Sequence, residues 1–163
     1  MTPIPTSQAD YQAMIESFNA ESDRGAAVLA GSYAENSLGM FLESFIVDPA
    51  PSERLFGSNG SLSTFSQRID FAQAFGHLSK QMCAELHLIR KIRNHFAHHP
   101  KASSFSESPV REWATSFTAA REVKFASGDS FKLDDPRIAY LMTIGMLMVL
   151  MNQKLHGVSN PDA

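Results

Sequence analysis

Apolar residues recur at helical spacing in several long segments of this chain, and no segment alternates like a strand. The widest pattern covers about residues 21–45, where the apolar surface is so broad that the helix should lie at the centre of the fold. Its early part, GAAVLAGS (residues 25–32), is rich in small residues, which let another helix approach closely. Because a chain of 163 residues suits one core, we predict an all-α fold, a single compact helical bundle of about five to seven helices.

Turn formers and capping residues divide the rest of this single domain, residues 1–163. The expected helices cover about residues 21–45, 61–76, 80–98, 109–117 and 136–155. Prolines, glycines and an Asn-Gly pair break the helical pattern over residues 48–61. Residues 120–135 could form a small hairpin or an apolar loop. We expect residues 1–17 to be a short N-terminal segment and residues 156–163 to be a C-terminal tail.

The composition argues against several classes of protein. A net charge of −3 and a pI near 6.0 do not suit a domain whose main task is to neutralise nucleic-acid phosphates. Cys83 is the single cysteine, so an intrachain disulfide is impossible. The N-terminus does not resemble a signal peptide, and the most apolar run, Ile138–Met151, has 14 residues where a membrane span needs about 20. We expect a cytoplasmic protein that does not enter the membrane and needs no cofactor.

The helix expected over residues 80–98 carries a charge within its apolar stripe. On a helical wheel, Arg93 falls near the centre of that stripe. Its apolar neighbours there are Met82, Leu86, Ile89 and Phe96. A guanidinium stays protonated, and leaving it unpaired in a core costs several kcal/mol. Arg93 therefore needs a carboxylate, a cleft or an anion, and Asp70 or the acidic run over residues 21–23 is the nearest candidate.

The same helix ends in RNHFAHH, residues 93–99. An arginine, a polar residue and a histidine, here Arg93, Asn94 and His98, resemble the motif of the HEPN superfamily of helical domains, many of which cleave RNA without a metal. A histidine can transfer the proton of a ribose hydroxyl, and an arginine can stabilise charge on the phosphate. The resemblance implies a site formed across a dimer. His95 and His99 have a spacing that can hold a metal, but no third ligand accompanies them, so we predict no metal site.

Three further stretches occur together and in order. They are FNAESDRGAAVLAGSY (residues 18–33), LFGSNGSLSTFSQRIDFAQAFG (residues 55–76) and LHLIRKIRNHFAHH (residues 86–99). Together they resemble the mannitol operon repressor family of bacteria, a group of small all-helical proteins. The resemblance covers about half of the chain and implies transcriptional repression of genes for mannitol uptake and use. It also implies action through another protein, since that family has no recognisable DNA-binding motif.

The resemblance implies that most of the matching residues are architectural. A charged network between helices would comprise Glu21, Asp23, Arg24, Asp70 and Arg93. The loop FGSNGSLS would cap a helix start. Its backbone N–H groups could also hold an anion such as a sugar phosphate, and the residues of this candidate loop are Gly57, Ser58, Asn59, Gly60 and Ser61. A plain set of turns without a ligand is the other interpretation of the loop.

Three functions therefore remain open at the level of sequence. The leading hypothesis is a non-enzymatic, repressor-like transcriptional regulator of a carbohydrate operon that lacks its own DNA-binding motif. It would act through another protein, for example a DNA-binding regulator, and would self-associate. The alternative is a metal-independent ribonuclease that uses Arg93, Asn94 and His98. A third hypothesis is a small-molecule sensor whose anion site lies near residues 57–63.

Overall fold

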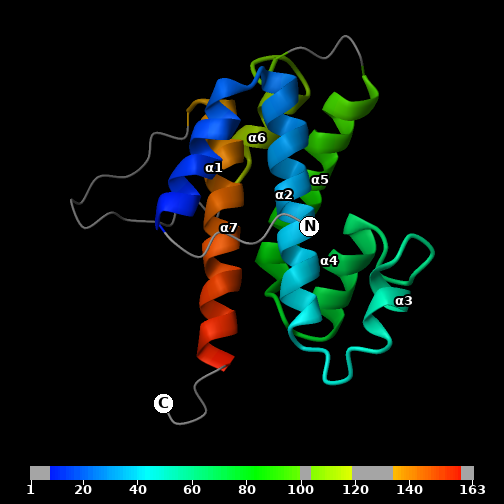
Figure 1. Cartoon of the computed structure of the whole chain (residues 1–163). Coiled ribbons are helices and arrows are strands. Elements are labelled where there is room, and N and C mark those ends of the chain that lie inside the picture. Colours follow the sequence, from blue (N-terminus) through cyan, green and yellow to red (C-terminus); the bar gives the residue numbers. More distant parts are fainter. Residues whose placement is uncertain (1–7, 100–103, 119–133, 159–163) are drawn as a thin grey trace.

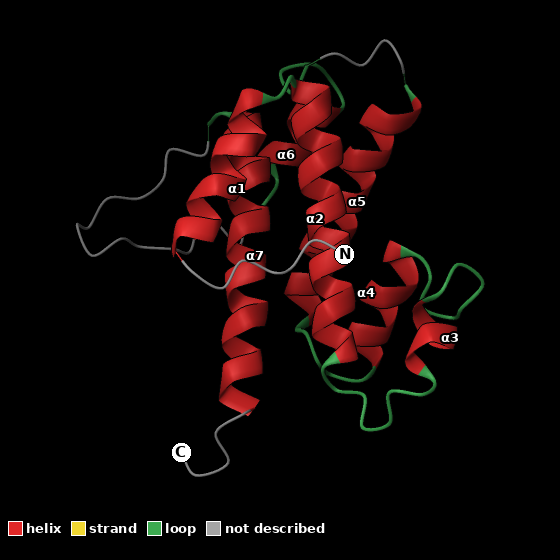
Figure 2. Cartoon of the chain, viewed as in Figure 1, coloured by secondary structure: helices red, strands yellow, loops and turns green. Residues whose placement is uncertain are grey.

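The computed structural model describes residues 8–99, 104–118 and 134–158, and every regular element in these ranges is a helix (Figure 1, Figure 2). The helices are α1 (Gln8–Ala20), α2 (Asp23–Glu43), α3 (Ser52–Phe56), α4 (Phe65–Ala74), α5 (Lys80–His98), α6 (Val110–Thr115) and α7 (Pro136–Val158). Seven helices in the described ranges confirm the predicted all-α bundle. The uncertain segment over residues 120–135 lies, apart from its last two residues, outside the described part.

Helix α2 is the centre of the bundle, as its broad apolar pattern predicts. It packs against α1, α4, α5 and α7 (Figure 1). Its small residues face these neighbours, and Ala26, Ala27, Ala30, Gly31 and Ala34 are buried. At Gly31 an added Cβ would lie 2.8 Å from the Arg93 Cβ and 2.9 Å from the Tyr140 hydroxyl oxygen. The glycine therefore lets α5 and α7 approach α2 closely.

Capping side chains begin four of the helices. Ser22 accepts a hydrogen bond from the Gly25 N–H, and Ser79 accepts one from the Met82 N–H. Thr64 and Gln67 form a reciprocal capping box, which starts α4 at Phe65 rather than near the predicted Ser61. Asp135 accepts from the N–H groups of Arg137 and Ile138 at 2.8 and 3.0 Å. These bonds satisfy N–H groups that a helix start leaves without partners.

Two helices were not predicted. Helix α1 lies largely within the expected N-terminal segment and contributes buried Met14 and Phe18 to the core. Helix α3 has five residues and lies within residues 48–61, where the turn formers predict a break in the helical pattern. The short α6 ends at Thr115, slightly earlier than expected, and α7 extends to Val158, into the expected tail.

Helix α7 is longer than the 14-residue apolar run that it contains. By length and composition alone, Pro136–Leu155, with a mean hydropathy of 1.4, could cross a membrane, and 39% of the stretch is buried inside the fold. A core helix passes the same test. One side of α7 is buried at helical spacing, through Tyr140, Ile144, Leu147 and Met151, and packs against α2 and α6. Met148 is also buried, whereas Met142 and Met146 are half-buried against Ala139.

Two glycines in helix interiors give a matched test of this packing. The substitution Gly31→Ala should destabilise the fold by about 1–3 kcal/mol, because the new methyl group would displace Arg93 and Tyr140. The control Gly145→Ala should be neutral or stabilising by up to about 1 kcal/mol, because nothing lies within 4 Å of its added Cβ and alanine is the better helix former. Urea denaturation of both variants measures the difference. Equal stabilities would contradict the close packing at Gly31.

Candidate functional site

Arg93 of α5 forms an ion pair with Glu35 of α2. The Arg93 Nη2 lies 2.6 Å from the Glu35 Oε2, and the two side chains are 23% and 22% exposed. The guanidinium also lies 5.9 Å from the centre of the Phe65 ring. Of the three options that the sequence leaves open for Arg93, a carboxylate, a cleft or an anion, the structure has a carboxylate. The expected partners were wrong, because neither Asp70 nor the acidic run over residues 21–23 provides it.

A second arginine approaches Glu35 from α4. Arg68 is buried, and its guanidinium donates to the Glu35 carbonyl oxygen at 3.1 Å and to the Leu62 carbonyl oxygen at 2.8 Å. It also lies 5.5 Å from the centre of the Phe56 ring. Arg68 was not among the predicted members of the charge network. A helical wheel could have found it, because Arg68 shares the buried side of α4 with Phe65, Ile69 and Ala72.

The other members of the predicted charge network form three separate clusters. Asp70 contacts the Nε2 of His87 at 3.2 Å. Asp23 pairs with Arg137 of α7 at 2.6 Å and also accepts from the Phe105 N–H at 2.9 Å. Arg24 donates to the carbonyl oxygens of Phe96 and His99 at the end of α5. Glu21 participates through its main-chain carbonyl, which accepts from Arg137 at 2.7 Å. The prediction of a single network is therefore wrong, because these residues form separate clusters that join different segments of the fold.

Removing the charge of Glu35 tests the central pair. The substitution Glu35→Gln should lower the free energy of unfolding by about 1–2 kcal/mol, because it leaves a partly buried guanidinium without its counter-charge. The pair is about a quarter exposed, so water weakens the effect. The control is Glu112→Gln, which breaks the exposed pair with Arg111 and should leave the melting temperature unchanged. If the wild type, Glu35→Gln and Glu112→Gln had the same melting temperature, the pair of Arg93 and Glu35 would not stabilise the fold.

The Asp23 cluster makes stability depend on pH. Burial alone would raise the pKa of Asp23, but hydrogen bonds from the Phe105 N–H, Arg137 and Ser104 outweigh it and hold the pKa below its usual value. An aspartate whose pKa is lowered by folding stabilises the fold above the unfolded-state pKa of about 4. That contribution is lost as the pH falls through the folded-state pKa.

We expect Asp23→Asn to lower stability at pH 7 and to flatten the fall in stability below about pH 4, because the lost carboxylate no longer needs a proton. Urea denaturation at pH 7 and at several pH values between about 2 and 5 measures both effects. The control is Asp134→Asn, an exposed aspartate that forms no ion pair within the described residues. An Asp23→Asn profile parallel to the wild type would show that this carboxylate does not contribute.

The candidate catalytic residues point in different directions. Arg93 faces α2, whereas His98 is exposed in the last turn of α5. Five residues of helix rotate the chain by about 500°, so the two side chains lie about 140° apart around α5. Asn94 is half-buried on the outer side of the same helix. Within one chain these residues do not converge on a common point.

The remaining histidines at the end of α5 pack on each other. The rings of His95 and His99 stack with their centres 4.4 Å apart, and His95 meets Trp113 of α6 edge to face at 5.5 Å. Burial lowers the pKa of His95, and the neighbouring His99 lowers it further. Within the described ranges, no group of three histidine, cysteine or acidic side chains could hold a metal ion. The pair is part of an aromatic cluster that joins α5 to α6.

The candidate anion loop is folded on itself. The N–H of Gly57 donates to the Glu53 carbonyl, and the N–H of Gly60 donates to the Gly57 carbonyl. At Gly60 an added Cβ would meet the Leu55 carbonyl oxygen, so the absence of a side chain is what allows this turn. Ser58, Asn59 and Ser61 are exposed. Because turn bonds occupy two of the five N–H groups, the geometry favours the plain turn, and an anion at this loop stays a prediction.

These observations define a class: an all-helical bundle whose charged side chains join helices to one another. The sequence matches no family model and no curated protein. Among solved structures, the fold is similar to that in the X-ray structure of the MtlR–HPr complex from Escherichia coli, with a TM-score of 0.69 and 15% sequence identity. The match covers 88% of this chain and 99% of the other. MtlR is a mannitol operon regulator, and the likeness shows that this chain has an MtlR-like fold.

Proposed function

We propose that this protein is a transcriptional regulator of a carbohydrate operon that acts through contacts with another protein and is not an enzyme. The observation that carries the proposal is the likeness to MtlR, which extends over nearly all of both chains. That structure holds MtlR in complex with HPr, so an HPr protein is the first partner to test here. The three sequence segments that resemble the mannitol operon repressor family support the same proposal.

The distribution of charge also supports indirect action. A protein that binds DNA through its backbone neutralises several phosphates, typically about six to ten in a strong contact. Here Arg24, Arg68, Arg93 and Arg137 are all engaged with carbonyl or carboxylate oxygens of the fold. The chain as a whole has 17 acidic against 14 basic residues, so its net charge of −3 does not favour a DNA backbone. On this proposal the arginine clusters are scaffolding, and the partner protein supplies any DNA contact.

Two binding measurements test the proposal directly. The purified protein should bind purified HPr from its own organism in about 0.15 M salt, with a dissociation constant in the micromolar range or tighter. It should not shift operator DNA by itself at the same salt concentration. Calorimetry and a gel-shift assay measure the two results. A tight, sequence-dependent shift with the protein alone would overturn the indirect mechanism, and a failure to bind HPr would remove this partner.

The ribonuclease alternative makes an opposite prediction. It requires Arg93 to leave Glu35, or a second chain to bring its His98 to the Arg93 of the first. On the regulator proposal, the protein should not cleave RNA in EDTA. If cleavage occurs, His98→Ala is the informative variant, because His98 is exposed and its loss should leave the fold intact. Cleavage that disappears in this variant, with an unchanged melting temperature, would favour the ribonuclease.

We extend the proposal to a cytoplasmic location and to self-association. A regulator that meets both a partner protein and a transcription complex would work in the cytoplasm. The outer side of α7 supports self-association, since Ile138 and Val149 are 45% and 38% exposed beside half-buried methionines. Sedimentation velocity over a range of protein concentrations would measure the association. A single monomeric species at every concentration would contradict it.

A further inference from the structure

Arg90 differs from the other partly buried arginines. In the described ranges, Arg24, Arg68, Arg93 and Arg137 each donate to oxygens of the fold. Arg90 is also half-buried, and its Nε, like that of Arg93, is shielded from solvent without a hydrogen-bond partner; unlike Arg93, it forms no hydrogen bond through another nitrogen in the described part. None of the ion pairs in the described part includes it. The shielded Nε cannot itself be reached from solvent, but no acceptor in the described part of the fold occupies the two terminal nitrogens of this guanidinium, so they can donate to an acceptor from outside the chain.

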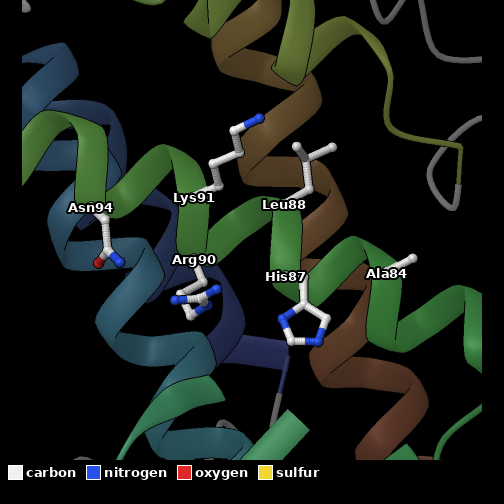
Figure 3. A pocket seen from close by; sticks show the side chains of 6 residues that line it. All are labelled: Ala84, His87, Leu88, Arg90, Lys91 and Asn94. Carbon is white, nitrogen blue, oxygen red and sulfur yellow. The ribbon is translucent and has the colours of Figure 1, made fainter. Parts of the chain in front are cut away.

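The surroundings of Arg90 form a shallow hollow on the outer side of α5. Its lining residues are Ala84, His87, Leu88, Arg90, Lys91 and Asn94. Figure 3 shows that the side chains of His87, Arg90 and Asn94 leave α5 along one edge, whereas Lys91 and Leu88 leave it along the other. Asn94 lies one helical turn beyond Arg90, so the two side chains are neighbours on the helix surface. Like Arg90, Asn94 forms no side-chain hydrogen bond in the described part of the fold.

Lys91 adds a second cation to this hollow. Its Nζ lies 4.0 Å from the centre of the Trp113 ring, a contact that leaves ammonium protons free for other acceptors. One carboxylate lies close by, that of Asp70, and it contacts the His87 ring at 3.2 Å. The residues that line the hollow therefore include a guanidinium, an ammonium and an amide but no carboxylate, although the chain as a whole has a net charge of −3. This local excess of donors and positive charge favours an anion.

We propose that the outer side of α5 is a binding site for a phosphate group, held by Arg90 and Asn94 with Lys91 adding charge. A guanidinium fork matches two oxygens of a phosphate, and an amide N–H₂ can donate to a third. A neutral sugar would need acceptors as well as donors, and the charged donors that dominate this hollow do not supply them. The site does not use Arg93, whose guanidinium Glu35 already holds.

The hollow on α5 is shallow, which limits how much of a ligand it can contact. The site would contact the phosphate end of a ligand and leave the rest in solvent, so recognition would be mainly electrostatic and sensitive to salt. The phosphate could belong to a small metabolite such as a sugar phosphate, or to a polynucleotide backbone. The two sources share the same contacts and differ in how many phosphates bind at once. This inference does not depend on the protein-contact function proposed above.

An NMR titration of the isotope-labelled protein with inorganic phosphate tests the site. Sodium chloride at matched ionic strength is the reference. We expect phosphate-specific, saturable shifts of the backbone amides around residues 87–94 and little change around residues 57–61. In Arg90→Gln the apparent affinity for phosphate should fall at least about tenfold. Arg54→Gln is the matched control, because Arg54 is exposed on α3 and also has no ion-pair partner among the described residues; it should bind phosphate as the wild type does.

Asn94→Ala keeps the test decisive if Arg90→Gln fails to fold. Asn94 forms no side-chain hydrogen bond in the described part of the fold, so its loss should weaken phosphate binding with little change in the melting temperature. Mannitol 1-phosphate and a short single-stranded RNA then separate the two sources of phosphate. Tighter binding of the sugar phosphate assigns a metabolite, and tighter, strongly salt-dependent binding of RNA assigns a polynucleotide. Shifts identical to those in chloride, or unchanged affinity in both α5 variants, would overturn the proposal.

Discussion

The position of Glu35 determines how three helices meet. Its carboxylate holds Arg93 of α5, and its main-chain carbonyl accepts from Arg68 of α4. Both arginines come from apolar helix faces, where an unpaired guanidinium would be very costly. Neither charge can be desolvated unless α4 and α5 lie correctly against α2. The electrostatic requirement therefore sets the relative register of these helices, and apolar packing around Ile69, Leu86 and Ile89 fills the remaining space.

The way in which these charges are used also bears on function. An arginine held by a carboxylate of its own fold is a poor candidate for stabilising a reacting phosphate, because the substrate would have to displace Glu35. Arg137 is likewise held by oxygens of its own fold, because it donates to the Asp23 carboxylate and to the carbonyls of Phe18 and Glu21. A bundle fastened in this way is suited to presenting fixed surfaces to a partner. Arg90 differs from these arginines, because it is half-buried and forms no ion pair within the described residues.

Local sequence signals predicted much of the fold. Helix α5 has the predicted limits because Ser79 is a clear N-cap and the apolar stripe is regular. Helix α7 begins where Asp135 and Pro136 predict it. By contrast, α1 and α3 are short or weakly patterned helices, which are marginal without tertiary contacts. Met14 and Phe18 of α1 are buried in the core, and Phe56 of α3 packs against it while half-buried.

The candidate site was less predictable from sequence. The wheel placed Arg93 correctly in the apolar stripe, but its partner lies 58 residues away on a helix whose rotation is set by packing. Asp70 and Asp23 were candidates because they lie on helices expected to contact α5, but in the structure they contact His87 and Arg137 instead. Arg68 lies on the apolar face of α4, but its acceptors are main-chain carbonyls, which the sequence does not distinguish from one another. Pairing across helices depends on tertiary geometry that periodicity alone does not contain.

The open surroundings of Gly145 offer a practical route to observing this molecule. Cys83, the single cysteine, is buried, and burial raises the pKa of its thiol, with Asp70 raising it further. A thiol that is both covered and protonated reacts slowly with alkylating reagents. A cysteine placed at position 145, where nothing obstructs a side chain, would therefore be the one reactive thiol among the described residues. A fluorophore or spin label attached there would report from the outer side of α7 without altering the interior.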